Sequence, residues 1–195
     1  KRTIDIVYST EFLLEKRKSP WGETQRDQKE GLEFSIEEYD EIDSFCKALN
    51  IDWFASSWDI ESQKLMRQYK FPHNKVASAM GTNISFLEEV ASEQKHTFLS
   101  TGMMDINMID SAVNVFRKNN CPTTLMHTVS TYPALEEELN LNCINTLRER
   151  YNLPVGYSGH EVSVSPSFMA AMMGAEAIEK HLSLIHISEP TRLGA

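Results

Sequence analysis

The stretch HTFLSTG (residues 96–102), followed by MMDINMIDSAVNVFRKNN (103–120), decides the fold class of this sequence. Its first part is a short apolar run that ends in small polar residues. Its second part places Ile109, Val113 and Phe116 at helical spacing on one face. A short apolar run bounded by turn signals and followed by a helix is typical of a parallel βα unit. The stretch therefore predicts one strand and its helix.

The same unit recurs along the chain. The further predicted strands are IDWFASS (51–57), NKVASAM (74–80), TTLMHTVS (123–130), LPVGYSGH (153–160) and EAIEKH (176–181). This alternation suits either a doubly wound sheet or part of a (β/α)8 barrel. No GxGxxG or Walker-type loop is present, which disfavours a nucleotide-binding sheet.

The position of polar residues favours the barrel. Small hydroxyls and histidines fall at the carboxyl ends of all six predicted strands, namely Ser57, Ser78, Ser100, Ser130, Ser158, His160 and His181. A barrel uses its whole ring of strand ends as one site, whereas an open sheet concentrates its site at one switch point. We therefore predict an α/β fold, a partial (β/α)8 TIM barrel that holds approximately strands three to eight.

Two segments before these units have their own patterns. Ser35 and Glu38 form a predicted capping box ahead of YDEIDSFCKAL, which predicts a helix start at this point. The stretch SPWGETQRDQKEGLEF (19–34) fits neither the strand period nor the helix period, and we predict a long loop there.

Composition narrows the class of protein. The chain has 195 residues, of which 41% are hydrophobic and 24% charged, as in ordinary globular proteins. A formal charge of −9 argues against a nucleic-acid-binding surface, although a local lysine and backbone N–H groups can still bind a phosphate. The three cysteines show no metal-binding spacing, and neither a membrane span nor a signal peptide is evident, so we expect a cytoplasmic protein.

Two histidines end consecutive predicted strands, His160 in GYSGHE and His181 in IEKH. In a parallel barrel they face the same mouth from neighbouring positions. Two neutral imidazoles there can hold a divalent metal and leave positions for water and a substrate oxygen. The pattern supplies no third protein ligand, so the alternative that the histidines only satisfy local hydrogen bonds stays equally open.

Glu179 lies two residues before His181, so strand alternation places both side chains on one face. A lone carboxylate inside a barrel is costly unless it is paired or close to a metal. Glu179 is therefore either a base or a partner of the metal site, or else one half of an ion pair with a buried lysine.

Lys75, Ser78 and Ser100 form a second candidate group. STG at 100–102 precedes a helix, so Ser100 and the following N–H groups can accept an anion at the helix N-terminus. Lys75 lies three residues before Ser78, and the two side chains converge only if the chain bends after Val76. Taken singly, such residues are more commonly helix caps or surface lysines, and only their gathering at strand ends favours a site.

Taken in order, FLSTGM, LMHTVSTYP, VGYSGHE and GAEAIEKH resemble the sialic acid synthase family. The stretches SPWGETQRDQKEGLEF and ASSWDIES are similar to its bacterial members. The resemblance runs from Lys1 to about His181. It implies a (β/α)8 barrel that condenses phosphoenolpyruvate with an N-acetylated hexose, such as N-acetylmannosamine, and releases phosphate.

The resemblance also implies roles for individual residues. It assigns the family's divalent metal, manganese or magnesium, to His160 and His181. The chemistry of the reaction leaves Glu179 a catalytic role, either in proton transfer or in holding a metal-bound water. The substrate-binding residues that the resemblance implies are Ser57, Lys75, Ser78, Ser100, Ser130, Tyr132 and Ser158. In KVASAMGTN, Ala77 and Ala79 replace two glycines of the family's KIGSGE and no acid follows, so we expect the substrate contacts there to differ from those of the family.

Two other functions stay open at this point. One is another barrel that condenses phosphoenolpyruvate with an aldose, although a sugar phosphate needs extra basic residues that the strand ends lack. The other is a sugar-binding barrel without catalysis.

The ends of the chain carry a further expectation. We predict that residues 1–184 are a fragment of the catalytic barrel, inactive by itself because two strands precede Lys1 and unpaired edges are exposed. The resemblance implies that the complete protein is a homodimer with a further C-terminal domain. LSLIHISEPTR resembles the translation of a sequencing-library adapter, so residues 185–195 are predicted to be a non-native tail and His186 is not counted as a ligand.

Overall fold

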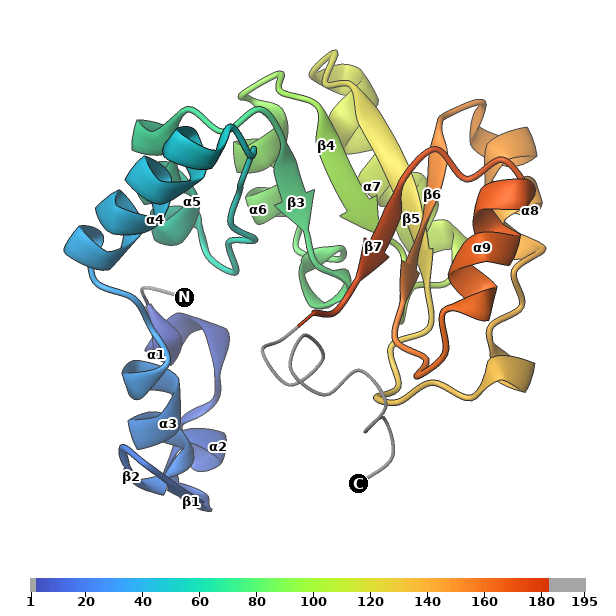
Figure 1. Cartoon of the computed structure of the whole chain (residues 1–195). Helices are drawn as coiled ribbons and strands as arrows, with labels where there is room; N and C mark the ends of the chain where they lie inside the picture. Colours follow the sequence, from blue (N-terminus) through green and yellow to red (C-terminus); the bar gives the residue numbers. More distant parts are fainter. Residues whose placement is uncertain (1–2, 183–195) are drawn as a thin grey trace.

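A computed structural model describes residues 3–182 of the chain (Figure 1). The predicted tail at 185–195 lies outside the described residues. The elements follow in the order α1 (Ile4–Val7), α2 (Thr10–Leu14), β1 (Lys16–Ser19), β2 (Gly22–Thr24), α3 (Gln25–Gly31), α4 (Ile36–Leu49), α5 (Ile60–Met66), η1 (Arg67–Tyr69), β3 (Asn74–Val76), η2 (Ser78–Met80), α6 (Ile84–Ala91), β4 (Thr97–Ser100), α7 (Ile106–Lys118), β5 (Thr123–Thr128), η3 (Glu136–Glu138), α8 (Cys143–Tyr151), β6 (Val155–Gly159), α9 (Ser165–Met172) and β7 (Ile178–Lys180).

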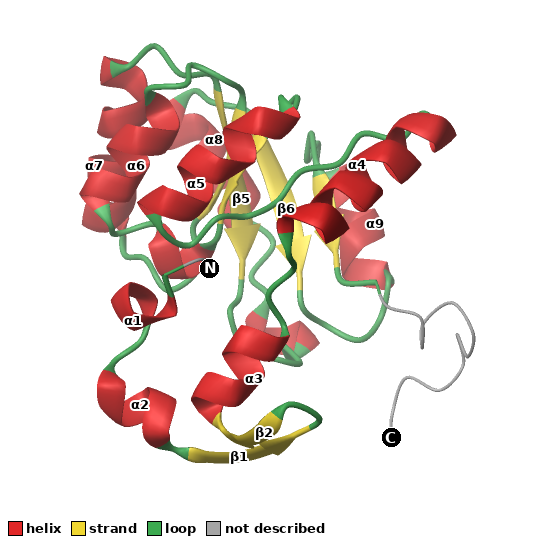
Figure 2. Ribbon diagram, turned by 90° about the vertical axis from the view of Figure 1, so that its left-hand side faces the viewer, coloured by secondary structure: helices red, strands yellow, loops and turns green. Residues whose placement is uncertain are grey.

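The centre of the molecule is a parallel sheet of five strands in the order β3-β4-β5-β6-β7. Each strand pairs with the next one along the chain, and the helices between them lie on the outer face of the curled sheet (Figures 1 and 2). Sequential parallel pairing with outer helices is the arrangement of a (β/α)8 barrel. The predicted fold class, a partial TIM barrel, is therefore confirmed.

The two faces of the sheet have different roles because side chains alternate along each strand. Toward the helices point apolar residues that are fully buried in the core, among them Val76, Leu99, Leu125, Val155 and Tyr157. The neighbours of these residues, among them Lys75, Ser100 and Ser158, point to the inner face. The core therefore fixes the strands from one side and leaves the other side for polar groups.

The helices that cover the sheet begin where polar caps stand. The predicted capping box at α4 is confirmed, since Ser35 Oγ accepts from the Glu38 N–H at 3.2 Å and Glu38 Oε2 accepts from the Ser35 N–H at 2.7 Å. Helix α7 begins at Ile106 and is capped by Asp105, whose Oδ1 accepts from Met108 N–H. The apolar face predicted for this helix is buried at Ile109, Val113 and Phe116.

The prediction of a strand at 51–57 is wrong, because none of its residues is assigned to a strand. A strand needs a ladder of hydrogen bonds to a neighbour. Among the described residues β3 pairs with β4 alone. The segment instead meets β3 through a side chain, since Ser56 Oγ donates to the Lys75 carbonyl at 3.3 Å.

The prediction of a long loop at 19–34 is also wrong. The chain there forms the antiparallel hairpin of β1 and β2 and then α3. Thr24 and Asp27 close a capping box at the start of α3. Gly31 ends this helix under the ring of Trp21, where a Cβ atom would lie only 2.0 Å from the indole. This segment lies on the side of the sheet toward which the strands run (Figures 1 and 2).

The helices and the cysteines complete the description of the chain. Within residues 3–182, none of the helices has the length and apolar character that crossing a bilayer requires. Cys46, Cys121 and Cys143 are all free thiols.

Candidate functional site

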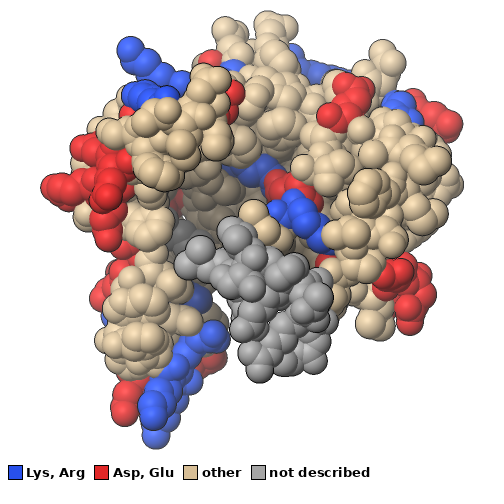
Figure 3. Space-filling model, viewed as in Figure 1, with Lys and Arg blue, Asp and Glu red and all other residues tan. Residues whose placement is uncertain are grey.

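A cavity of about 530 Å³ opens at the carboxyl ends of the strands, on the inner face of the half-barrel. Figure 3 shows a hollow on this face in which atoms of basic and acidic side chains lie side by side. The cavity is lined by Phe54, Ser56, Trp58, Lys75, Ala77, Ser78, Ala79, Ser100, Met103, Thr128, Ser130, Tyr132, Ser158, His160, Glu179 and His181. It therefore collects polar side chains from every strand of the sheet, as the barrel prediction requires.

Lys75 is the buried cation of this cavity, with 8% of its side chain exposed. Its Nζ donates to Ser100 Oγ at 2.7 Å and lies 3.1 Å from Glu179 Oε2. The chain bends directly after Val76, where β3 ends and the short helix η2 begins at Ser78. Because of this bend, Lys75 and Ser78 line the same cavity, as the sequence required for a joint role.

Glu179 connects β3 to the last two strands. Its carboxylate accepts from Ser158 Oγ at 2.9 Å and is paired with Lys75, and 41% of its side chain remains exposed. Of the two alternatives for this residue, the structure contains the ion pair with a buried lysine. The open side of the carboxylate still faces the cavity, so it remains accessible to a ligand.

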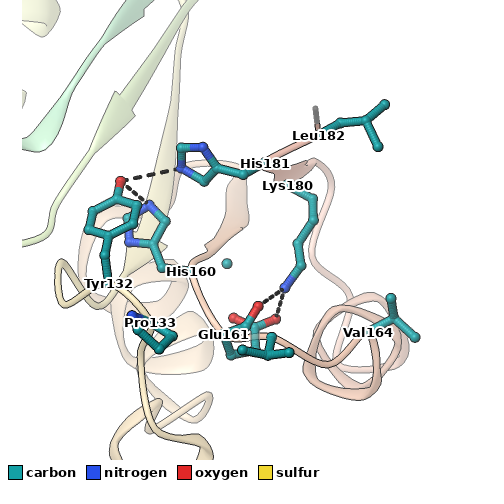
Figure 4. A pocket seen from close by; sticks show the side chains of 10 residues that line it. Tyr132, Pro133, His160, Glu161, Val164, Lys180, His181 and Leu182 are labelled. Carbon is teal, nitrogen blue, oxygen red and sulfur yellow. Dashed lines mark hydrogen bonds and ion pairs between the residues drawn. The ribbon is translucent and has the colours of Figure 1, made fainter. Parts of the chain in front are cut away.

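The two histidines converge on one point (Figure 4). The Tyr132 hydroxyl lies 2.8 Å from His160 Nε2 and 3.3 Å from His181 Nε2, and its ring stacks on His160 at 4.0 Å between centroids. His160 Nδ1 lies 2.6 Å from the Val129 carbonyl. A carbonyl only accepts, so Nδ1 carries the proton and Nε2 of the neutral ring has its lone pair free.

The electrostatics favour that neutral ring. Burial lowers the pKa of His160, and the neighbouring His181 adds to the effect. The pKa of Tyr132 is raised by burial and by the nearby Glu179 carboxylate, so its phenol stays protonated and can donate. The Tyr132 hydroxyl therefore lies within reach of both Nε2 atoms, and its single proton can be donated to Nε2 of His160.

Tyr132, His160 and His181 also form the wall of a second cavity of about 430 Å³ (Figure 4). On its far side Lys180 Nζ is bonded to the Glu161 carboxylate and to the Ser163 carbonyl. The Glu161 side chain is fully buried and also accepts from Tyr157 Oη at 2.7 Å. Burial alone would raise the pKa of Glu161, but the hydrogen bonds from Lys180 and Tyr157 outweigh burial and lower it.

The donor set fits a metal in part. Two Nε2 atoms aimed at one oxygen, one of them with its tautomer fixed by a carbonyl, are what a divalent ion requires of histidine ligands. Among residues 3–182, however, no three His, Cys, Asp or Glu side chains gather as a metal-binding group. The histidines can thus supply two ligands, with the remaining positions open to water, substrate or other groups.

The structure brings most of the predicted site residues together but not all. Ser57 does not line the cavity, and its buried hydroxyl faces the other side of its segment, whereas Ser56 takes the cavity position. Ser100 lies in the cavity, but α7 begins only at Ile106, so the predicted anion site at a helix N-terminus is absent there.

Sequence reasoning missed three residues at this mouth. Thr128 lines the main cavity, and Glu161 and Lys180 line the second one. Thr128 had a usable signal, because it lies two residues before Ser130 and alternation places it on the same face. Glu161 and Lys180 had no signal, since only the folded chain shows that they pair.

The model of the NeuB family matches residues 2–189 of the chain. The chain belongs to the NeuB family. The resemblance to the sialic acid synthases is thereby confirmed. The N-acetylneuraminate-9-phosphate synthase of Drosophila melanogaster is 35% identical over 166 residues, which make up 84% of this NeuB chain and 45% of the relative. The N,N'-diacetyllegionaminic acid synthase of Campylobacter jejuni is 33% identical over 83% of this chain and 49% of its own length.

Solved structures agree with these relatives. The crystal structure of an N-acetylneuraminic acid synthetase from Leptospira borgpetersenii matches this NeuB chain with a TM-score of 0.80 at 31% identity, over 87% of this chain and 60% of that one. The chain spans about half the length of the curated relatives that it matches. The relatives therefore establish the family to which the chain belongs.

Proposed function

We propose that the protein condenses phosphoenolpyruvate with an N-acetylated hexose, such as N-acetylmannosamine or a related amino sugar, to give a nonulosonic acid and phosphate. One observation supports this most directly. The cavity places a buried lysine, several hydroxyls and two convergent histidines at one mouth of a NeuB-family half-barrel. The lysine and the hydroxyls can bind an anion, and the histidines beside them can hold the group that binds a substrate carbonyl.

Lys75 and its neighbours suit the anionic substrate. A buried ammonium with Ser100 at 2.7 Å, in a cavity that also contains Ser78 and Ser158, offers one positive charge and several hydroxyl donors. Such donors hold a phosphate or a carboxylate in a fixed orientation before the reaction begins. We assign phosphoenolpyruvate to this part of the cavity.

His160 and His181 suit the sugar aldehyde. We propose that their Nε2 atoms hold a divalent ion, manganese or magnesium, and that Tyr132 then turns to the substrate. When bound, such an ion would act as a Lewis acid toward the C1 aldehyde of the open-chain sugar. The histidines thus orient the acceptor carbon toward the anion held by Lys75.

The reaction balances with these groups. A bond forms from C3 of phosphoenolpyruvate to the aldehyde carbon, water adds to C2, and the bond from C2 to the phosphate oxygen breaks as C2 becomes a carbonyl. One proton of the water ends on the former aldehyde oxygen, which becomes a hydroxyl, and the other leaves with the phosphate. Glu179, which Lys75 and Ser158 hold in place, is positioned to accept the proton that the water loses.

The test measures phosphate release and product together. The protein that carries this chain is incubated with phosphoenolpyruvate, a panel of N-acetylated hexoses and Mn²⁺, and the nonulosonic acid is quantified against phosphate. We expect one-to-one formation, abolished by chelation, and loss of Mn²⁺ binding by electron paramagnetic resonance in H160Q/H181Q. H73Q, which changes a histidine outside the two cavities, is the matched control.

Other outcomes point to other functions. Turnover only with a sugar phosphate would show a different condensing barrel. Binding of sugar by folded protein without turnover of any N-acetylated hexose would show a sugar-binding barrel. We further propose, from the family resemblance alone, that the whole protein is a cytoplasmic homodimer, which analytical ultracentrifugation and cell fractionation test.

A further inference from the structure

Two hydroxyl groups at the cavity are buried and have no hydrogen-bond partner within residues 3–182. They are Thr128 Oγ1 and Ser130 Oγ. Thr128 is 6% exposed, and both residues line the cavity that contains Lys75. An unpartnered buried hydroxyl costs free energy, so native proteins keep few of them, and those that remain need a reason.

The Ser130 hydroxyl and the methyl group of Thr128 belong to a small cluster around Gly102. A Cβ atom on Gly102 would lie 2.3 Å from Ser130 Oγ, 2.8 Å from Ser78 Oγ and 2.7 Å from Thr128 Cγ2. Any side chain at Gly102 would therefore collide with all three residues. We call Ser78, Thr128 and Ser130 the hydroxyl cluster, and a glycine is what allows its members to approach one another.

Strand register links the hydroxyl cluster to the rest of the cavity. Thr128 is the last residue of β5 and pairs in register with Ser158 of β6, which donates to Glu179. Thr128 thus connects the other two members of the hydroxyl cluster to the strand that meets the Lys75–Glu179 pair.

We infer that Thr128 is a substrate-binding residue, whose hydroxyl donates to an oxyanion of the anionic substrate in the cavity. The inference rests on the proposed function, and it adds a residue that the family resemblance did not assign. The hydroxyl is covered in the structure, so it reaches a ligand by a turn about χ1 that moves Oγ1 to the staggered position that Cγ2 now holds. Since Oγ1 has no partner to give up, this turn breaks no hydrogen bond.

Thr101, the residue directly after the neighbouring strand β4, provides the contrast. It is equally buried, at 7% exposure, but its hydroxyl donates to the Met126 carbonyl at 3.2 Å and does not line the cavity. A threonine with a structural role has its hydroxyl occupied in this way. Thr128 differs from it in having a free donor and a place beside the ligand.

The experiment compares T128V, T128S and the control T101V in the protein that carries this chain. Valine keeps the shape of threonine and removes the hydroxyl, and serine keeps the hydroxyl. Melting temperatures are measured without ligand, and dissociation constants are measured for phosphoenolpyruvate, inorganic phosphate and pyruvate. The last two probes separate the phosphate end of the substrate from its carboxylate end.

We expect T128V to melt at or above the wild-type temperature, because it removes a hydroxyl that has no partner. It should bind phosphoenolpyruvate about tenfold more weakly, the loss of one hydrogen bond to a charged group, and T128S should restore binding. T101V should show the reverse, a lower melting temperature with unchanged binding. If T128V also binds inorganic phosphate more weakly, Thr128 contacts the phosphate end of the substrate. If it binds pyruvate more weakly instead, Thr128 contacts the carboxylate end.

Equal affinity of T128V and the wild type for all three probes would overturn the inference and leave the proposed function standing. Failure of the wild type to bind any of the probes would instead overturn the proposed function, and the inference with it. A T128V protein that melts well below the wild type, with T128S unable to restore binding, would show that Thr128 is a packing residue.

Discussion

Two lysine–glutamate pairs meet at the mouth of the half-barrel, and they are built in opposite ways. In the pair of Lys75 and Glu179 the lysine is 8% exposed and the glutamate 41%. In the pair of Lys180 and Glu161 the lysine is 27% exposed and the glutamate is fully buried. Glu179 and Lys180 are adjacent in β7, so alternation sends one to the inner face and the other to the outer face.

The difference separates a pair that is open to a ligand from a pair that holds the rim together. Glu161 has its charge met by Lys180 and by the Tyr157 hydroxyl, and Lys180 also donates to two backbone carbonyls. Within residues 3–182, Glu179 is hydrogen-bonded and ion-paired only to Lys75 and Ser158 and keeps its other side toward the cavity. Burial of the acid, rather than the presence of an ion pair, decides which role each pair can have.

Removal of Lys75 should have the largest effect on activity. K75M leaves Glu179 half open to water, which can solvate it, so we expect the melting temperature to change little. The anionic substrate loses its buried cation, and kcat/KM should fall about 10³-fold. Steady-state kinetics and calorimetry of K75M test this, with K118M on the exposed end of α7 as the control. Activity within threefold of the wild type would contradict the assignment of Lys75.

Removal of Lys180 should have the largest effect on stability. K180M leaves the Glu161 carboxylate buried without its cation, with the neutral Tyr157 hydroxyl and a backbone N–H as donors. A buried charge that loses its partner costs about 3 kcal/mol of unfolding free energy. Denaturant unfolding of K180M measures this loss. If K180M were as stable as K75M, the contrast between the two pairs would be wrong.

Acid should weaken the pair of Lys180 and Glu161. The pKa of Glu161 is lowered in the folded protein, so near pH 4 the unfolded chain binds its proton more readily than the folded protein does. Its contribution to stability is thus present above its ordinary pKa and is lost as the pH falls through the lowered value. The melting temperature should therefore drop between pH 5 and pH 3, and it should drop less in E161Q. Parallel curves for the two proteins would exclude Glu161 as a source of the acid sensitivity.

Single replacements of the two adjacent serines, Ser56 and Ser57, should have the smallest effects on activity. S56A removes a cavity-lining hydroxyl and its bond to the Lys75 carbonyl, so we expect KM for phosphoenolpyruvate to rise about threefold. S57A removes a buried hydroxyl without a partner and should leave both KM and stability near the wild-type values. The opposite order would show that the sequence-based choice of Ser57 was right.

Much of the fold was predictable because parallel strands are marked by short apolar runs with polar ends. Five of the six predicted strands exist, and the helix start at Ser35 follows from side-chain chemistry that acts within four residues. The segment 51–57 has the composition of a strand but lacks the neighbour that would give it a ladder. Composition reports the propensity of a segment, while a strand also depends on what lies beside it.

The loop predicted at 19–34 failed for a different reason. The start of its helix is marked by Thr24 and Asp27, which have the same three-residue separation as the capping box of α4. The residues that follow, however, place few apolar side chains at helical spacing. Most candidate site residues were predictable, since parallel strands bring their carboxyl ends to one edge. The partners of Glu179 and Lys180 could not be predicted. Lys75 is 104 residues from Glu179 and Glu161 is 19 residues from Lys180, so both pairs depend on the curvature of the sheet and on the direction of the side chains.

The placement of both pairs on one short strand has a consequence for how this sequence can change over time. A substitution alters one pair and spares the other. A one-residue deletion just before β7 would instead carry Lys180 into the inward place of Glu179, opposite Lys75, and would strip Glu161 of its cation in the same step. Sequence drift is therefore expected to tolerate new residue types between Gly174 and His181 far more readily than any change in the length of that segment.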